Sequence, residues 1–308
     1  TFEAGTVMKF VGSNTGIDVT GKIVVNGTGL NPVVFTSIND DTFGGDSNGN
    51  NNATSAAPGD WDGIYIHGYL SNQGIGEFDW CTIRYGGYQF GDASSNVKFY
   101  YSDSSHFINS KSEYSFSAAI KCNMCSPEIT NNTINNNNNE VIYLTNSSSV
   151  IRGNTINDNL GYGIYISGSD SIPNLGNNDV SDKGLNTFQN NDNGIYHVYN
   201  ATINDINAYY NNWGYSIADS IDTHIYDDNE LSSFGEVLFN PWYINEVLAA
   251  NFEANITSGV SPLNVTFTDL STGNPTSWTW YFGDGQSSTD QNPTNVYQNP
   301  GIYTVSLD

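Results

Sequence analysis

One alternating triplet recurs along the chain, as Ile120-Lys121-Cys122, Ile142-Tyr143-Leu144, Ile164-Tyr165-Ile166 and Ile195-Tyr196-His197. Between its copies runs a second triplet, as Asn132-Thr133-Ile134, Asn154-Thr155-Ile156 and Asn186-Thr187-Phe188. The first copies start 22 residues apart and the last about 31, because Gly168–Lys183 interrupts the pattern. Short alternating units separated by Asn-rich turns at such a period indicate a β-solenoid, since each unit can bury its apolar face only against a copy of itself.

The composition also favours short strands and many turns. Gly, Asn, Ser, Thr and β-branched residues dominate, and strong helix formers are scarce. The aromatic content of 13% argues against disorder. Since no apolar run reaches about 18 residues, we expect no membrane insertion. The chain begins with Thr1 rather than Met, so we expect it to be processed or part of a longer protein.

The charge is strongly acidic, with 32 acidic residues against 8 basic ones and a net charge of −24. No Lys or Arg follows Lys183. A surface of this sign repels nucleic-acid phosphates and anionic lipid headgroups, so we expect neither as a partner. The excess of carboxylates instead favours the binding of divalent cations and a high solubility of the protein.

The repeat ends before the chain does. The sequence pattern of the solenoid continues to about Tyr243. Beyond it, apolar and polar residues alternate in Val265-Thr266-Phe267 and Trp278–Phe282, as they do in the strands of a β-sandwich. We therefore predict two domains, a β-solenoid over residues 1–249 and a small β-sandwich over residues 250–308.

The second domain resembles a PKD domain, which is an immunoglobulin-like β-sandwich. The matching segments are Pro262–Asp269, Ser271-Thr272-Gly273, Trp278–Gly285, Asn292-Pro293-Thr294 and Gly301–Val305. The last strand of the family runs further than Asp308, so we expect this copy to be truncated there. The resemblance implies an extracellular spacer or adhesive module.

The first domain resembles the right-handed parallel β-helix repeats of bacterial and archaeal surface proteins and of polysaccharide-degrading enzymes. The shared phrases are Asp40-Asp41, Gly44–Asn50, Pro58–Trp61, Gly63-Ile64, Asn212-Trp213-Gly214 and Pro241-Trp242. The expected fold class is therefore all-β, a right-handed parallel β-helix followed by an immunoglobulin-like PKD sandwich. The scaffold does not fix the function, because it carries lyases, hydrolases, adhesins and structural proteins alike.

A calcium site is predicted in the loop before Trp61. Asp46, Asn48 and Asn50 alternate with small residues, which lets a loop curl its side-chain oxygens around one hard cation. The predicted Ca²⁺ ligands are Asp40, Asp41, Asp46, Asn48, Asn50 and Asp60. A solvated Asn/Gly insertion without a metal is the alternative.

The middle residue of each apolar triplet points outward. Tyr143, Tyr165 and Tyr196 should therefore form an outer file of rings on neighbouring coils, with Lys121 at its end. Such a file could stack on sugar rings, or it could be a self-stacking ladder that only stabilises the sheet. His197 takes an inward position, which predicts a buried histidine.

Asparagines fall into two predicted roles. Asn132, Asn154 and Asn186 share one register and should hydrogen-bond along the helix axis. Asn-x-Ser/Thr sequons predict N-glycosylation if the protein is secreted by a cell that glycosylates. They lie at Asn26, Asn52, Asn131, Asn146, Asn200, Asn255 and Asn264.

Cys81, Cys122 and Cys125 make an odd count. Buried small hydrophobic residues, a Cys122–Cys125 disulfide and a metal site are the open interpretations, the last without a second Cys/His pair nearby.

We predict an extracellular surface or matrix protein with a structural or adhesive role, able to assemble into filaments or a surface layer. Its expected partners are other surface proteins, copies of itself, or glycans. We assign no catalytic residue and no organic cofactor. The alternatives are a polysaccharide lyase or hydrolase, and a non-catalytic carbohydrate-binding protein. The cationic groups that a lyase would need could come from Arg84, Lys98, Lys111 and Lys121.

Overall fold

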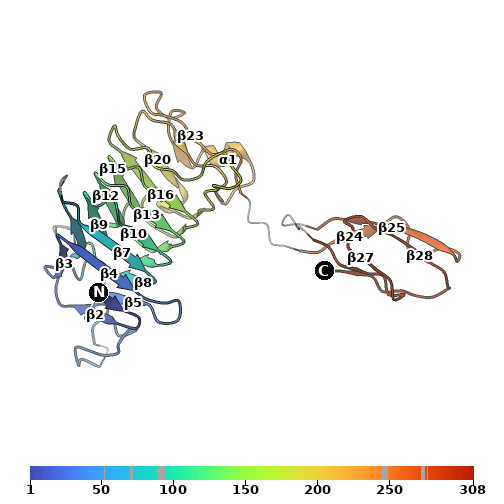
Figure 1. Cartoon of the computed structure of the whole chain (residues 1–308), viewed down its shortest axis with the longest axis horizontal. Coiled ribbons are helices and arrows are strands. Elements are labelled where there is room, and N and C mark those ends of the chain that lie inside the picture. Colours follow the sequence, from blue (N-terminus) through green and yellow to red (C-terminus); the bar gives the residue numbers. More distant parts are fainter. Residues whose placement is uncertain (52, 70–71, 89–93, 244–248, 272–274, 276) are drawn as a thin grey trace. The chain divides into compact units, whose positions relative to one another are not determined.

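The computed structural model describes the chain except residues 52, 70–71, 89–93, 244–248, 272–274 and 276 (Figure 1). The chain divides into two units, Thr1–Tyr243 and Ile244–Asp308, and each has its own buried core. Among the described residues, no helix is long and apolar enough to cross a membrane.

The first unit is built from parallel strands that stack coil upon coil (Figure 1). Sheet A has the order β1 (Phe2–Glu3), β4 (Lys22–Asn26), β7 (Ile75–Asp79), β10 (His106–Ile108), β13 (Glu128–Thr130) and β16 (Val150–Arg152). Sheet B has the order β2 (Val7–Phe10), β5 (Val33–Ser37), β8 (Cys81–Arg84), β11 (Lys111–Glu113), β14 (Thr133–Asn135), β17 (Thr155–Asn157) and β19 (Thr187–Gln189).

Sheet C forms the third wall of the coil. Its order is β3 (Gly16–Val19), β6 (Gly63–His67), β9 (Ser95–Tyr100), β12 (Ala118–Asn123), β15 (Ile142–Thr145), β18 (Ile164–Ser167), β20 (Val198–Asn200) and β22 (Ile225–Tyr226). The last coils add a parallel pair, β21 (Ile206–Asn207) and β23 (Val237–Leu238), a short helix α1 (Ala218–Asp222) and the 3₁₀ turn η1 (Asp192–Gly194). Ile120, Ile142 and Ile164 pair in register on sheet C, which confirms the predicted stacking.

Asparagine shapes the corners between the sheets. Asn109 and Asn131 have φ of 51° and 58° between sheets A and B, and Gly153 takes the same corner one coil later with φ of 63°. Asn and Gly tolerate this left-handed conformation better than other residues. The residue after each corner then turns into the interior, as Asn132 and Asn154 do.

These inward asparagines form a ladder along the coil axis. Nδ2 of Asn132 donates to Oδ1 of Asn154 over 2.9 Å, Asn154 donates to Asn186 over 3.0 Å, and Asn186 donates to Asn211 over 2.9 Å. The predicted ladder is confirmed, and Asn211 extends it by one coil. A second ladder, which the sequence did not reveal to us, joins Asn137–Asn159–Asn191 over 2.9 and 2.8 Å.

The second unit is an antiparallel sandwich. One sheet contains β24 (Phe252–Ala254), β25 (Leu263–Asp269) and β28 (Thr294–Tyr297), and the other contains β27 (Ser287–Ser288), β26 (Trp280–Tyr281) and β29 (Ser306–Leu307). Phe267, Trp280 and Phe282 are buried between the sheets. Parallel coils followed by an antiparallel sandwich confirm the expected all-β fold class.

Candidate functional site on the outer face of sheet C

The outward positions of sheet C form one continuous file across its strands. The backbone register joins, in order, Asp18, Tyr65, Lys98, Lys121, Tyr143, Tyr165, Tyr199 and Tyr226. Each of these side chains is at least partly exposed, while the residues beside it in the strand point into the core. The alternation of each strand therefore presents this file to solvent.

The predicted position of Tyr196 in this file is wrong. Tyr165 pairs with Tyr199, because Val198 rather than Ile195 takes the inward place opposite Ile164. Val198 lies seven residues after Asn191, whereas Ile164 lies five residues after Asn159, the ladder partner of Asn191. The segment that contains η1 therefore adds two residues before the strand, so a register counted from the Ile195-Tyr196-His197 phrase starts too early. Tyr199 and Tyr226 are the file members that the sequence reading missed, although Val198-Tyr199-Asn200 carries a similar pattern.

The tyrosine rings of the file stack on one another. Ring centroids lie 5.0 Å apart for Tyr143 and Tyr165, 5.4 Å for Tyr165 and Tyr199, and 4.2 Å for Tyr199 and Tyr226. The last two rings are nearly parallel, at 5°. Since neighbouring rings share their faces, this geometry favours the self-stacking ladder and leaves ring edges and hydroxyls for a partner.

Two further tyrosines flank the file. Tyr162 lies 4.8 Å from Tyr199, and Tyr196 stands almost perpendicular to Tyr226 at 5.4 Å. Carboxylates border this group. Burial and then the nearby Glu140 raise the pKa of Asp192 above its ordinary value. The C-terminal half of sheet C thus carries a patch of tyrosines with acidic neighbours, which we call the tyrosine wall: Tyr143, Tyr162, Tyr165, Tyr196, Tyr199 and Tyr226.

The N-terminal half of the file contains two basic side chains, unlike the C-terminal half with its tyrosines and acidic neighbours. Lys98 and Lys121 lie in register on adjacent strands, as the Cα partners of β9 and β12 show. The Nζ of Lys98 is 4.3 Å from the ring centroid of Tyr65, and the Nζ of Lys121 is 5.2 Å from that of Tyr143. Of the four bases named above for a lyase, the structure brings these two together.

The other two bases lie on sheet B. Arg84 is buried, its guanidinium 3.6 Å from Asp40 and 3.3 Å from Glu113, and its Cζ is 4.7 Å from the centroid of Tyr85. Breaking such a buried set would leave an uncompensated charge, so Arg84 stabilises the fold. Lys111 begins β11 and is exposed.

The residues predicted to bind calcium make hydrogen bonds with several different groups of the protein. Asp40 accepts from Thr36 over 2.6 Å, and Asp60 accepts from Ser37 over 2.5 Å. The Asp46 carboxylate accepts backbone N–H groups of Asn50 and Asn51 over 3.1 and 2.8 Å, and the bond from Asn51 is the main cause that lowers its pKa.

Asn48, Asn50 and Asp41 complete the predicted calcium set. Nδ2 of Asn48 donates to Asn39 over 3.3 Å, and Nδ2 of Asn50 donates to Thr54 over 2.5 Å. Asp41 lies with Asp40 on a polar cavity of about 400 Å³. The loop is folded around its own polar side chains, and Ca²⁺ binding stays a prediction.

His197 is buried, as predicted, in an aromatic stack near the C-terminal coils. Its ring centroid lies 5.9 Å from Phe188 and 5.4 Å from His224, and Phe188 in turn lies 4.8 Å from Trp213. Burial, followed by the nearby His224, lowers the pKa of His197 to about 3. The imidazole is therefore neutral at ordinary pH and belongs to the core.

Most sequons lie where a glycan could be attached. Asn26, Asn131, Asn255 and Asn264 are exposed, and Asn146 is half-buried. Asn52 lies outside the described residues. Asn200 differs from these, because its side chain is fully buried and its Nδ2 donates to the carbonyls of Asn204 and Gly235 over 2.9 and 2.8 Å. Glycosylation of the sequons stays a prediction.

The cysteines are buried free thiols. Burial raises the pKa of Cys81 to about 12 and that of Cys122 well above its ordinary value. The Sγ of Cys125 donates to the carbonyl of Phe99 over 3.3 Å. The interpretation as small buried hydrophobic residues is confirmed, and the Cys122–Cys125 disulfide is absent from the structure.

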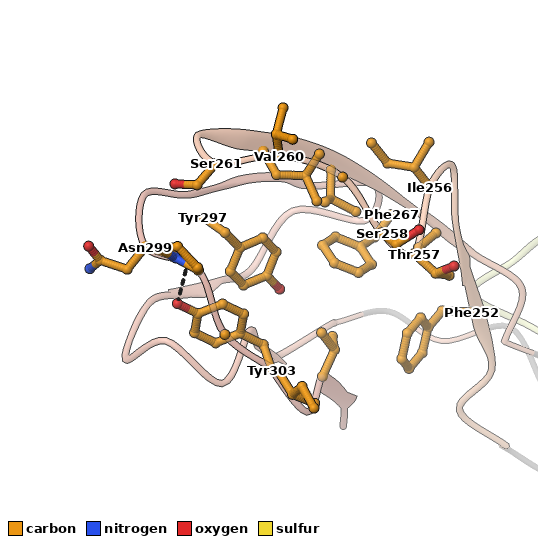
Figure 2. A pocket seen from close by; sticks show the side chains of 18 residues that line it. Phe252, Ile256, Thr257, Ser258, Val260, Ser261, Phe267, Tyr297, Asn299 and Tyr303 are labelled. Carbon is orange, nitrogen blue, oxygen red and sulfur yellow. Dashed lines mark hydrogen bonds between the residues drawn. The ribbon is translucent and has the colours of Figure 1, made fainter.

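The second unit has an apolar cavity of about 940 Å³ at one end of its sandwich (Figure 2). Phe252, Phe267, Tyr297 and Tyr303 line it, and the hydroxyl of Tyr303 donates to the carbonyl of Asn299 over 3.0 Å. The Tyr297 and Tyr303 rings stack at 4.5 Å. Phe252 and Tyr303 are half-buried at this end, whereas Phe267 and Tyr297 are buried.

Comparison with known families agrees with this architecture. Residues 42–182 match the family model described as a right handed beta helix region, and residues 245–308 match that of the PKD domain. No curated protein and no solved structure matches the chain. The chain therefore combines a right-handed β-helix region with a PKD domain, a pair that is typical of extracellular or surface proteins.

Proposed function

We propose that the protein is a structural or adhesive protein of the cell surface or extracellular matrix, and that the outer face of sheet C is its adhesive surface for a glycan. The single observation that carries this proposal is the tyrosine wall. Four of its members, Tyr143, Tyr165, Tyr199 and Tyr226, are held in register by the pairing of parallel strands. An ordered surface loses little entropy on binding.

The wall offers a glycan two kinds of contact. Because Tyr143, Tyr165 and Tyr199 share their ring faces, their hydroxyls and ring edges are what a partner meets. Tyr162 stacks on Tyr165 at 6.0 Å and is tilted to Tyr199, and Tyr196 is perpendicular to Tyr226. Both widen the aromatic surface beside the file. Tyrosine suits such a role, since its ring is apolar and its hydroxyl makes hydrogen bonds.

The test is binding of the purified chain to a panel of immobilised neutral and acidic polysaccharides. We expect saturable binding to at least one polymer, and a loss of about tenfold or more in affinity in Tyr162→Ala/Tyr196→Ala, as for aromatic contact residues elsewhere. Tyr243→Ala/Tyr281→Ala is the matched control, because both side chains are exposed and lie off sheet C. No binding to any polymer, or equal losses in both variants, would refute the proposal.

A polysaccharide lyase is the second candidate function. The observation that favours it is the placement of Lys98 and Lys121 on adjacent strands beside Tyr65 and Tyr143, since a lyase needs a base and a cation to neutralise a uronate carboxylate. The same panel discriminates the two functions when unsaturated products and new reducing ends are measured. Release of unsaturated products or new reducing ends would show that the protein degrades a polysaccharide and would refute the adhesive function.

A further inference from the structure

Tyr199 and Tyr226 lie directly opposite each other on the last two strands in the order of sheet C. Their Cα atoms are partners in the parallel pairing of β20 and β22. The two ring centroids are 4.2 Å apart and the rings are parallel to within 5°. The next pairs of the file, Tyr165–Tyr199 and Tyr143–Tyr165, are wider, at 5.4 and 5.0 Å. The backbone therefore holds two phenols in contact at this position.

Both phenols can be reached by a small oxidant. Tyr199 and Tyr226 are half-buried on the outer face of the sheet, so neither ring is enclosed in the core. Burial, followed by the neighbouring Tyr226, raises the pKa of Tyr199 to about 12. The Tyr199 phenol is therefore neutral at ordinary pH, and no phenolate charge on it drives the two rings apart.

The contact favours a reaction between the two rings over a reaction with another molecule. Groups that a structure holds together react as if their concentration were far higher than free molecules can reach. The carbons ortho to the hydroxyl lie on the ring edge, so stacked rings must turn before these carbons can bond. Side chains at a surface change rotamer rapidly, and both rings are partly exposed.

We propose that Tyr199 and Tyr226 are a site of oxidative modification, at which a haem peroxidase and hydrogen peroxide join the two rings as dityrosine. Each phenol loses one electron and its hydroxyl proton. The rings then bond through carbons ortho to oxygen, and those carbons pass their hydrogens to the oxygens. Hydrogen peroxide takes up both electrons and both protons and becomes two molecules of water. Such a cross-link needs no glycan and is independent of the adhesive function.

The cross-link fastens the end of sheet C. β22 is the last strand in the order of this sheet, and its pairing with β20 joins Val198 to Ile225 and Tyr199 to Tyr226. A covalent bond across so short a pairing closes the loop between the two coils. Closing a loop covalently stabilises a fold mainly because it restricts the unfolded chain.

The test is oxidation of the dilute purified chain with a haem peroxidase and hydrogen peroxide. Protease digestion and mass spectrometry should find the peptides of Tyr199 and Tyr226 joined with the loss of two hydrogen atoms. Electrophoresis should place this product in the monomer band. The oxidised chain should unfold at a higher urea concentration than the untreated chain. Free tyrosine in a parallel reaction checks that the oxidant is active.

Tyr199→Phe removes one phenol and keeps a ring in the stack, so its monomer should lose the dityrosine fluorescence and the gain in urea resistance. Tyr303→Phe is the matched control and should retain both. Tyr303 also stacks on a tyrosine, at 4.5 Å, but that partner, Tyr297, is buried and its hydroxyl donates to the carbonyl of Phe282. Circular dichroism checks the fold of both variants.

Three results would overturn the inference. The first is a native chain that yields no joined peptide of Tyr199 and Tyr226 while free tyrosine couples in the parallel reaction. The second is dityrosine confined to dimers, which would mean that exposed tyrosines of separate molecules react instead. The third is equal monomer fluorescence in Tyr199→Phe and the native chain.

Discussion

The side-chain amide of Asn154 donates a hydrogen bond to Oδ1 of Asn186 over 3.0 Å, although the two residues lie 32 positions apart in the chain. The same amide donates to the carbonyl of Ile129 over 2.8 Å, and its Oδ1 accepts from Asn132. One buried side chain therefore ties three successive coils together.

Replacing Asn154 with Ala should destabilise the β-helix by about 3 kcal/mol, because several buried polar groups lose their partners at once. Urea unfolding followed by circular dichroism measures the change. Asn138→Ala is the matched control, since its side chain is exposed in a turn, and should alter the free energy of unfolding by less than about 0.5 kcal/mol. Equal effects of the two substitutions would show that the ladder contributes nothing.

Acid should destabilise the first unit through His197. The unfolded imidazole takes up a proton near its ordinary pKa of 6.5, whereas the buried one does so only at about 3. The unfolded chain thus binds more protons between these values, and stability falls as pH decreases from about 6.5 towards 3, by up to about 1.4 kcal/mol per pH unit.

The variant His197→Phe removes this titration and keeps a ring beside Phe188. Urea unfolding of the native chain and the variant at pH 7, 6, 5 and 4 (values chosen to span roughly the window between the two pKa values) should show a smaller pH dependence in the variant. Parallel stability curves would contradict the buried, neutral histidine.

Asp227 should act in the opposite direction. Burial is the main cause that raises its pKa to about 6 from 3.8, so the folded chain holds this proton more tightly than the unfolded one. The stability that it contributes is present below pH 3.8 and is lost as pH rises through about 6. Urea unfolding at several pH values should therefore show that the native chain loses stability as pH rises through about 6 and that Asp227→Asn does not. The amide nitrogen of Asn cannot accept the backbone N–H groups that the two carboxylate oxygens accept from Asn229 and Val237, so the comparison is one of pH dependence and not of absolute stability.

N-glycosylation should spare Asn200. Expression in a host that glycosylates, followed by peptide mass spectrometry, should find no glycan there, because the amide nitrogen is buried and donates both its protons within the fold. Asn131 and Asn264 are exposed and serve as the comparison within the same sample. A glycan on Asn200 would mean that the coil around it opens during maturation.

The calcium prediction can be checked by calorimetry. Titration of Ca²⁺ into the native chain should release heat that Asp46→Ala lacks, since a bound cation would need this carboxylate. Asp179→Ala is a matched control, because Asp179 likewise accepts the backbone N–H of a residue in its own exposed turn, Ser181. An unchanged heat in Asp46→Ala would remove the site.

The sequence was sufficient to predict the coil wherever its spacing is constant. The steps from Ile120 to Ile142 and Ile164 pair as expected, because the apolar triplet and the 22-residue period agree there. The prediction for Tyr196 was wrong where the period changes, since the length of a turn does not show which of two nearby apolar residues enters the core. Ring orientation could not be predicted either, because it depends on neighbours in adjacent coils.

The segment Gly168–Lys183 enlarges one coil, and yet the coils on either side of it stay hydrogen-bonded through Asn154 and Asn186. Extra residues are therefore accommodated at a corner, outside the stacked strands. The β-helix should accept foreign peptides at such a corner and hold them at a fixed height along its axis, which would make the chain a usable scaffold for peptide display.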